Sequence, residues 1–486
     1  MSKIRKIFVG AFFSSASKLF HRAIGLVSII ILARILAPED FAYIALITII
    51  LYLFDTLSNV GAEQYIIQKS EVSERDLNSA WSLDIVLKSI FAILLYLSAS
   101  LVAHFLDKPD LSLAIQFSAC ILIINALKNP GLLLLKRDFD YKKIFILSFF
   151  QKVISFIVLI VLAFQWTNFW AFIWADIISS LVFTIGSYLS HRYRPTWDLS
   201  NARTQWLFSR WLLAKSVIGY LRSQIDTFVV GKFFSSHQLG NYSMSREIAM
   251  LPAHNLLGPA VDTLLADFKN FKHAPNALGR RVSKVFTVVI CIATPIVAFI
   301  ASYPDLIINV LLGPQWSLAI ELLPTMSILF YYFVFLIVAE NVLTAIGKVE
   351  EVFVFDLISL LTLIVAFTLF FNFSHDLNDL LLFRVITGIC LTAMLIFYLN
   401  KYILVSFFTL FVNVVLALFC SKLSIIISES VSKITDSDFI NLFVTGFIFC
   451  FTYILCLFIF AFTMRKSSLM NLFPFELLKT EIWRKS

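Results

Sequence analysis

Long apolar segments recur from one end of the chain to the other, and short polar segments separate them. A bilayer core of about 30 Å needs about 20 helical residues to cross it, and most of these segments reach that length. They lack the short alternating pattern of a transmembrane β-barrel. The pattern therefore predicts an all-α polytopic membrane protein.

About 14 transmembrane helices are predicted. The first apolar run begins soon after Lys3, Arg5 and Lys6, as a signal peptide would, but it continues to Leu36 without a small-residue cleavage site. We therefore expect a retained first span. The predicted spans cover residues 11–36, 41–59, 80–106, 111–135, 144–164, 168–190, 209–234, 239–264, 282–303, 318–345, 351–371, 377–400, 403–427 and 439–464.

A pattern in the first span nearly repeats in the seventh. Lys18 corresponds to Lys215 and Arg34 to Lys232, at an offset of about 198 residues. Six spans separate the repeats, so both run in the same sense, which indicates two parallel six-helix lobes around a central cavity. The predicted domains are an N-terminal lobe (1–200), a C-terminal lobe (201–402), and two extra helices with a tail (403–486).

Composition agrees with a membrane location. Hydrophobic residues make up 59% of the 486 residues and charged residues only 14%, against roughly 25% charged in soluble domains. No stretch of soluble composition is long enough for a separate catalytic domain, so we expect a function within the membrane and no enzyme. The six cysteines all lie in apolar runs without metal-ligand spacing, so neither metal nor cofactor is predicted.

The net charge of +8 first suggests cytoplasmic anchoring in a membrane protein, and not a nucleic-acid partner. With the N-terminus inside, the alternate loops of one side are basic, while the opposite loops offer little beyond Lys108 and Lys433. This asymmetry predicts that both termini are cytoplasmic. The basic cytoplasmic segments hold Lys3, Arg5, Lys6, Lys69, Arg75, Lys136, Arg137, Lys142, Lys143, Arg192, Arg194, Arg203, Lys269, Lys272, Arg280, Arg281, Lys348, Lys401, Arg465, Lys466, Lys479, Arg484 and Lys485.

Several cations lie inside the predicted spans, where each costs about 2.5–3.5 kcal/mol and needs a partner, water or a route to the interface. Snorkelling to the surface is an alternative for the lysines. Snorkelling explains Arg22 and Arg222 less well, because at a rise of about 1.5 Å per residue they lie roughly 18–20 Å from the cytoplasmic ends of their helices. A cationic cavity suits an anionic ligand such as phosphate, pyrophosphate or an acidic sugar. The candidate substrate-binding residues are Lys18, Arg22, Lys88, Lys128, Lys152, Lys215, Arg222 and Arg246.

Carboxylates and prolines supply candidates for ion coupling or gating. Lys88 follows Asp84 by four residues and Asp226 follows Arg222 by four, so each pair is alternatively a structural ion pair. The most polar span, 239–264, is interrupted by prolines and is either a packed kink or a bending gate. The candidates for coupling or gating are Asp55, Asp176, Asp226, Glu247, Pro252 and Pro259.

Six short motifs resemble those of Wzx-type polysaccharide flippases, which belong to the multidrug/oligosaccharidyl-lipid/polysaccharide exporter superfamily. Two departures are Ala42, where family members usually have glycine, and the sequence DTLLADF from Asp262, where Phe-Pro-x-Leu-Ser is usual. The motifs are ARILAPEDF (33–41), GAEQYIIQK (61–69), LKRDFDY (135–141), DTFVVG (226–231), LGNY (239–242) and AIGK (345–348).

The resemblance implies alternating-access transfer of oligosaccharide repeat units, carried on undecaprenyl pyrophosphate, from the cytoplasmic to the periplasmic face of a bacterial inner membrane. Such units serve O-antigen, capsule or exopolysaccharide synthesis. Implied partners are the lipid-linked oligosaccharide, membrane lipids and polysaccharide assembly proteins such as a polymerase, without nucleic acid. Alternatives are an ion-coupled multidrug antiporter of the same superfamily and a scaffold subunit; tiny outer loops disfavour a glycan polymerase or ligase.

Overall fold

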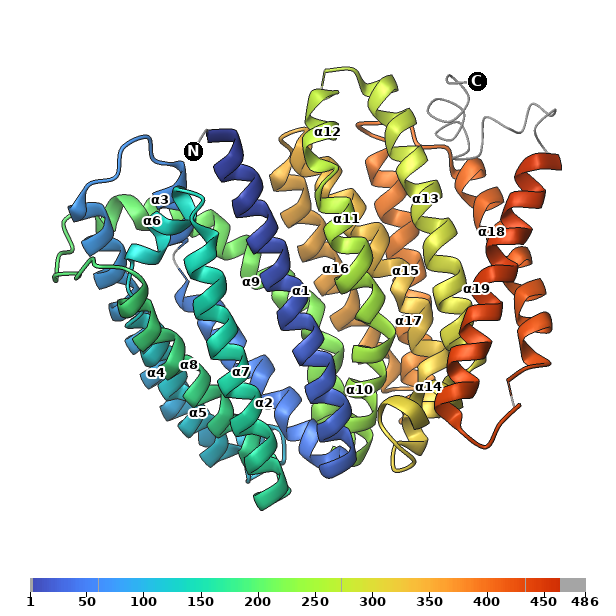
Figure 1. Cartoon of the computed structure of the whole chain (residues 1–486), viewed down its shortest axis with the longest axis horizontal. Helices are drawn as coiled ribbons and strands as arrows, with labels where there is room; N and C mark the ends of the chain where they lie inside the picture. Colours follow the sequence, from blue (N-terminus) through green and yellow to red (C-terminus); the bar gives the residue numbers. More distant parts are fainter. Residues whose placement is uncertain (1–2, 60, 272, 433, 464–486) are drawn as a thin grey trace. The chain divides into compact units, whose positions relative to one another are not determined.

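The computed structural model describes residues 3–59, 61–271, 273–432 and 434–463 (Figure 1). Helices dominate this part of the chain, and none of its residues is assigned to a strand. The prediction of an all-α polytopic membrane protein is therefore confirmed. Three parts of the predicted charge pattern lie outside the described residues: Lys272, Lys433 and the basic tail from residue 464 onward.

The chain forms two compact units, Met1–Gly240 and Asn241–Ser486, which we call unit 1 and unit 2. In unit 1, α4 packs against α5, α7 packs against both α1 and α8, and α2 contacts α4, α5 and α9. The helices of unit 1 are α1 (Lys3–Ile35), α2 (Pro38–Ser58), α3 (Ala62–Gln68), α4 (Glu74–Phe105), α5 (Leu111–Ala126), α6 (Gly131–Arg137), α7 (Tyr141–Trp166), α8 (Trp170–Ser190) and α9 (Ala202–Phe233).

Unit 2 is built around α15, whose most apolar segment is 67% buried. Helices α13 and α17 pack against it. Helix α18 packs against α13 and α19. The chain enters unit 2 through α10 (Ser236–Pro252). It continues as η1 (Ala253–Leu257), α11 (Gly258–Asp262), α12 (Leu265–Asn270), α13 (Pro275–Ser302), α14 (Pro304–Leu311), α15 (Ser317–Ala345), α16 (Val349–Phe370), α17 (Leu377–Leu399), α18 (Phe407–Glu429) and α19 (Asp438–Thr463).

Eleven helices of the described chain are long and apolar enough to cross a membrane, or 12 if the bent pair of α5 and α6 forms one span. Helix α9, with 32 residues, and the continuous run of α10, η1 and α11 are long enough but more polar. Counting both would give the predicted fourteen. That number therefore stays a prediction with which the structure is compatible.

The division after Gly240 lies about 40 residues beyond the lobe boundary expected from the repeat. The cause is α9, which packs against α2, α3 and α4 and so belongs to unit 1. The hydroxyl of Tyr220 on α9 donates a hydrogen bond to the carbonyl oxygen of Ile49 on α2 at 2.9 Å. Two lobes related by a repeat stay a prediction.

The Ala33–Phe41 motif is a helix junction. It ends α1 and begins α2, where Pro38 has no N–H to leave unpaired. The carboxylate of Asp40 accepts hydrogen bonds from the N–H groups of Ala37 at 3.1 Å and Phe169 at 3.0 Å. This junction fixes the start of α2, the helix that carries Asp55.

Candidate functional site

Lys88 of α4 holds two carboxylates inside unit 1. Its Nζ lies 3.3 Å from Asp84, one turn earlier on α4, and 3.6 Å from Asp55 on α2. The side chain of Lys88 is only 12% exposed. Of the alternatives for Lys88, the ion pair with Asp84 is the one that the structure shows.

Asp176 on α8 adds a third carboxylate to this group. It interacts electrostatically with Lys128 and Lys152, and Lys128 is also within range of both carboxylates that Lys88 binds. The ammonium of Lys128 lies 4.9 Å from the ring centre of Phe183. Three lysines and three aspartates, equal in formal charge, thus each lie within electrostatic range of at least one opposite charge. We call this group the unit 1 charge cluster: Asp55, Asp84, Lys88, Lys128, Lys152 and Asp176.

Lys128 lies in the break between α5 and α6. The two helices meet at a 64° bend, and Asn129 lies in the bend with 1% of its surface exposed. Its backbone N–H donates to Ser187 at 2.9 Å, its amide donates to the carbonyl of Tyr193 at 2.8 Å, and its side-chain oxygen accepts from the N–H of Gly131 at 2.8 Å. Because polar groups at the break form hydrogen bonds within the protein, the bend is a stable part of the fold.

A cavity of about 190 Å³ lies between α2, α5 and α8, within unit 1. The carboxylates of Asp55 and Asp176 line it, as do the polar side chains of Thr48, Ser118 and Asn125. The charge cluster therefore borders a cavity whose lining is mostly apolar but includes two carboxylates. Elsewhere in the described ranges, too, no three His, Cys, Asp or Glu side chains could jointly hold a metal ion.

The predicted cations of the first span lie on α1, which packs against α7. Lys18 is exposed and Arg22 is half-buried. His21, between them in sequence, interacts electrostatically with Lys152 on α7. The cluster therefore extends toward α1 through Lys152, while Lys18 and Arg22 do not line the cavity between α2, α5 and α8.

Helix α9 carries three further predicted residues. Arg222 is 7% exposed and Asp226 is fully buried, in the part of the helix that Tyr220 fastens to α2. Lys215, nearer the start of α9, is half-buried. Arg222 and Asp226 therefore lie in a packed region of unit 1.

The remaining predicted residues lie in unit 2. The guanidinium of Arg246 lies 5.9 Å from the ring centre of Phe333 on α15, and Glu247 is exposed. Pro252 ends α10 and Pro259 lies in α11, and the π-helical turn η1 separates them. Such turns often mark functional sites, and here the turn places an irregular segment between the two candidate gating prolines.

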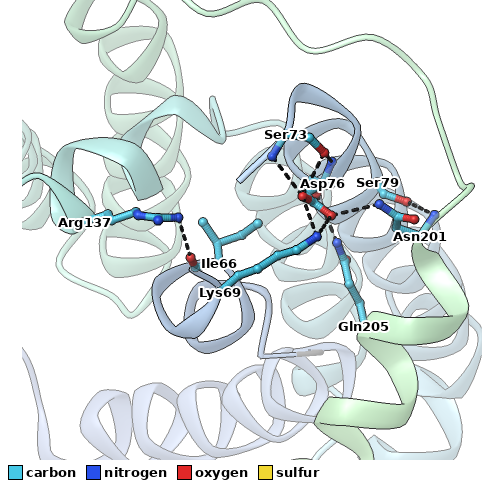
Figure 2. A network of polar contacts seen from close by, with 8 residues as sticks. All are labelled: Ile66, Lys69, Ser73, Asp76, Ser79, Arg137, Asn201 and Gln205. Carbon is cyan, nitrogen blue, oxygen red and sulfur yellow. Dashed lines mark hydrogen bonds and ion pairs between the residues drawn. The ribbon is translucent and has the colours of Figure 1, made fainter. Parts of the chain in front are cut away.

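A buried hub that sequence reasoning missed lies at the start of α4 (Figure 2). Asp76, fully buried, accepts hydrogen bonds from the ammonium of Lys69 at 2.7 and 2.8 Å, the hydroxyl of Ser73 at 2.8 Å and the amide of Asn201 at 2.8 Å. The hydrogen bond to Asp76 raises the pKa of Lys69. The capping-box spacing of Ser73 and Asp76 could have revealed this hub.

The hub joins two motifs of the resemblance. Arg137, the last residue of α6, donates to the carbonyl of Ile66 at 3.4 Å (Figure 2). Lys136, beside it in the same motif, pairs with Glu63 at 2.6 Å. Gln205 at the start of α9 donates to the carbonyl of Asp76 at 3.1 Å. These motifs therefore fasten α3, α4, α6 and α9 to one another.

The chain belongs to the family described as polysaccharide biosynthesis protein, whose model matches residues 31–321. It is 24% identical over 332 residues to the lipopolysaccharide biosynthesis protein WzxC of Escherichia coli (strain K12), an alignment that covers 68% of each chain. The resemblance to Wzx-type proteins is therefore confirmed.

Solved structures share the fold. The lipid II flippase MurJ in an inward closed conformation matches with a TM-score of 0.75 and 15% identity, covering 94% of this chain and all of MurJ. A multidrug resistance MATE transporter in an inward-facing conformation matches with a TM-score of 0.57 and 12% identity, covering 79% of this chain and 95% of its own. At these identities the likeness shows the fold alone.

Proposed function

We propose that this protein is a flippase for oligosaccharide repeat units linked to undecaprenyl pyrophosphate. The observation that carries the proposal is the unit 1 charge cluster, held inside a membrane protein of the polysaccharide biosynthesis family. The substrate would pass from the cytoplasmic to the periplasmic face of a bacterial inner membrane by alternating access, with both termini cytoplasmic. O-antigen, capsule and exopolysaccharide are the candidate products, and a polymerase is a candidate partner.

The lysines of the cluster are the proposed ligands of the pyrophosphate. Lys88, Lys128 and Lys152 present three ammonium groups among the cluster carboxylates. An entering pyrophosphate would replace the carboxylates as the partner of these ammonium groups and form charge-assisted hydrogen bonds with them. The lipid chain would stay in the bilayer. The other proposed substrate-binding cations are Lys18, Arg22, Lys215, Arg222 and Arg246.

The same exchange suggests a role for the carboxylates. When the pyrophosphate takes over the lysines, Asp55 and Asp176 lose their counter-charges, and uptake of a proton or cation would restore neutrality. Asp226 and Glu247 are further candidates for coupling. Pro252 and Pro259, on either side of η1, are proposed as the points at which this segment bends during transport.

If the substrate crosses without a co-bound proton or cation, the membrane potential alone would favour outward transfer. A pyrophosphate diester carries about −2, and each charge is worth about 2.3 kcal/mol per 100 mV, so an inside-negative potential of about 100 mV contributes roughly 4–5 kcal/mol. A coupled ion is therefore not required by the energetics. Collapsing the potential in proteoliposomes should slow flipping, and an unchanged rate would remove this argument.

An ion-coupled multidrug antiporter is the second candidate. The carboxylates of Asp55 and Asp176 at the cavity favour it, because they suit a cationic drug and its exchanged ion. Neutralising Arg22 and Arg222 together separates the two functions. We expect this double variant to lose flipping; the antiporter predicts that export of a cationic drug depends on Asp55 and Asp176 and survives the double change.

Deletion of the gene tests the proposal in the cell. We expect lipid-linked repeat units to accumulate on the cytoplasmic face and the surface polysaccharide to disappear, with recovery from a plasmid that carries the wild-type chain. Normal surface polysaccharide in the deletion strain, with no second copy of such a gene, would contradict the proposal.

A further inference from the structure

We propose that the cavity between α2, α5 and α8 is a subsite for one sugar ring of the substrate, the ring attached directly to the pyrophosphate. This inference rests on the proposed function and divides the substrate between two neighbouring parts of unit 1. The charge cluster would hold the pyrophosphate, and the cavity would hold the sugar.

The size of the cavity suits a single ring. Its volume is about 190 Å³. An apolar cavity of about 150 Å³ accommodates benzene, a six-membered ring, whereas pockets for drug-sized molecules measure about 300–1,000 Å³. One hexose ring with its substituents is therefore the expected occupant, and a longer glycan would have to extend beyond the cavity.

The lining matches the chemistry of a sugar. Sugar hydroxyls donate and accept hydrogen bonds, and the carboxylates of Asp55 and Asp176 are acceptors that make charge-assisted bonds with such donors. The amide of Asn125 offers both donors and an acceptor. The rings of Tyr52 and Phe172 supply apolar surface for the C–H face of the sugar.

Ser118 provides an independent sign of a binding site. It lines the cavity, is only 1% exposed, and its buried hydroxyl finds no hydrogen-bond partner within the described chain. A buried hydroxyl without a partner costs free energy that a ligand hydroxyl would recover. The side chain is therefore placed to contact a polar ligand.

Asp55 indicates which sugar is bound. It lines the cavity and also lies 3.6 Å from Lys88 of the charge cluster. Only the side chain of Asp55 therefore separates a ligand in the cavity from the proposed pyrophosphate site. The first sugar of the repeat unit is joined directly to the pyrophosphate, so it alone can reach the cavity while the pyrophosphate contacts Lys88.

Flipping of three defined lipids in proteoliposomes tests the inference. The probes are a polyprenyl pyrophosphate without sugar, the same lipid with one N-acetylhexosamine, and the lipid-linked repeat unit purified from the deletion strain. We expect the wild-type protein to flip the monosaccharide lipid about tenfold faster than the bare lipid. Ser118→Leu fills the cavity and should reduce the rate for the monosaccharide lipid to the rate for the bare lipid. Ser118→Ala should give a rate for the monosaccharide lipid between these two.

Thr362→Leu is the matched control, because it makes a similar change at an exposed position of α16. If the wild-type protein flips the repeat unit but Ser118→Leu flips every lipid at the wild-type rate, the subsite is wrong while the flippase stands. If Ser118→Leu instead alters only the dependence on Na⁺ or pH, the cavity is an ion site and the inference is overturned. If the wild-type protein flips none of the three lipids, the proposed function itself fails.

Discussion

The ammonium of Lys88 on α4 lies 3.6 Å from the carboxylate of Asp55 on α2, and so links two helices through a charge pair in a membrane protein. Removing such charges from water costs free energy, and well-packed apolar residues would often be equally stable or more so. Stability alone therefore does not account for the pair. Its charges are available to an anionic ligand that can exchange with the carboxylate.

Replacing Lys88 by alanine should lower both stability and flipping. The change leaves Asp55 and Asp84 facing each other without their shared counter-charge. We expect a cost below the about 3–5 kcal/mol of fully buried pairs, because the Asp55 side chain is 33% exposed. The thermal unfolding midpoint of the purified protein measures this cost.

The double variant Lys88→Ala/Asp84→Asn separates structure from function. Neutralising one carboxylate should restore part of the lost stability, because the remaining negative charge is less strongly repelled. Flipping should stay low, because the ammonium that contacts the pyrophosphate is still absent. Equal unfolding midpoints for the single and double variants would show that the carboxylates do not depend on Lys88.

The hub around Asp76 predicts a local loss of structure. Asp76→Asn removes the negative charge that Lys69 contacts at 2.7 Å, and hydrogen bonds to charged groups contribute about 1.5–3 kcal/mol. We expect faster proteolysis of the segment 191–201, whose Asn201 binds the carboxylate. Glu71→Gln, exposed in the loop that precedes α4, is the control and should leave the cleavage rate unchanged.

Two glycines should respond in opposite ways to alanine. A Cβ on Gly240 would lie 1.8 Å from the carbonyl oxygen of Pro38, whereas a Cβ on Gly25 meets no atom within 4 Å. Gly240→Ala must therefore displace backbone and should cost at least about 1–3 kcal/mol. Gly25→Ala should be neutral or stabilise α1 by up to about 1 kcal/mol. Unfolding midpoints that fall equally in both variants would contradict this account.

Local sequence patterns predicted several of these features. The four-residue spacing of Asp84 and Lys88 indicated an ion pair as one alternative, and the predicted boundary between the spans 11–36 and 41–59 matches the junction of α1 and α2 to within a few residues. Both depend on residues close together in the chain, so periodicity and capping rules apply to them. The membrane class followed from the length of the apolar segments, because a bilayer imposes that length on any helix that crosses it.

The charge cluster could not be predicted in full. Asp55, Lys128 and Asp176 come from α2, from the bend after α5 and from α8, and their proximity depends on helix packing that one sequence does not reveal. The sequence therefore predicted a cationic cavity, whereas the structure places three carboxylates among the lysines. The full hub around Asp76 could not be recognised from sequence, because Asp76 lies before the predicted span 80–106 and its partners Asn201 and Gln205 are about 125 residues away in the chain.

The most direct test of the central claim is the rate at which the reconstituted protein flips the purified lipid-linked repeat unit, measured as the fraction that an impermeant reagent can reach. The wild-type protein should flip this lipid, and Lys88→Ala/Lys128→Ala should reduce the rate at least about tenfold. A double variant that reconstitutes normally and flips at the wild-type rate would contradict the claim that the unit 1 charge cluster binds the substrate.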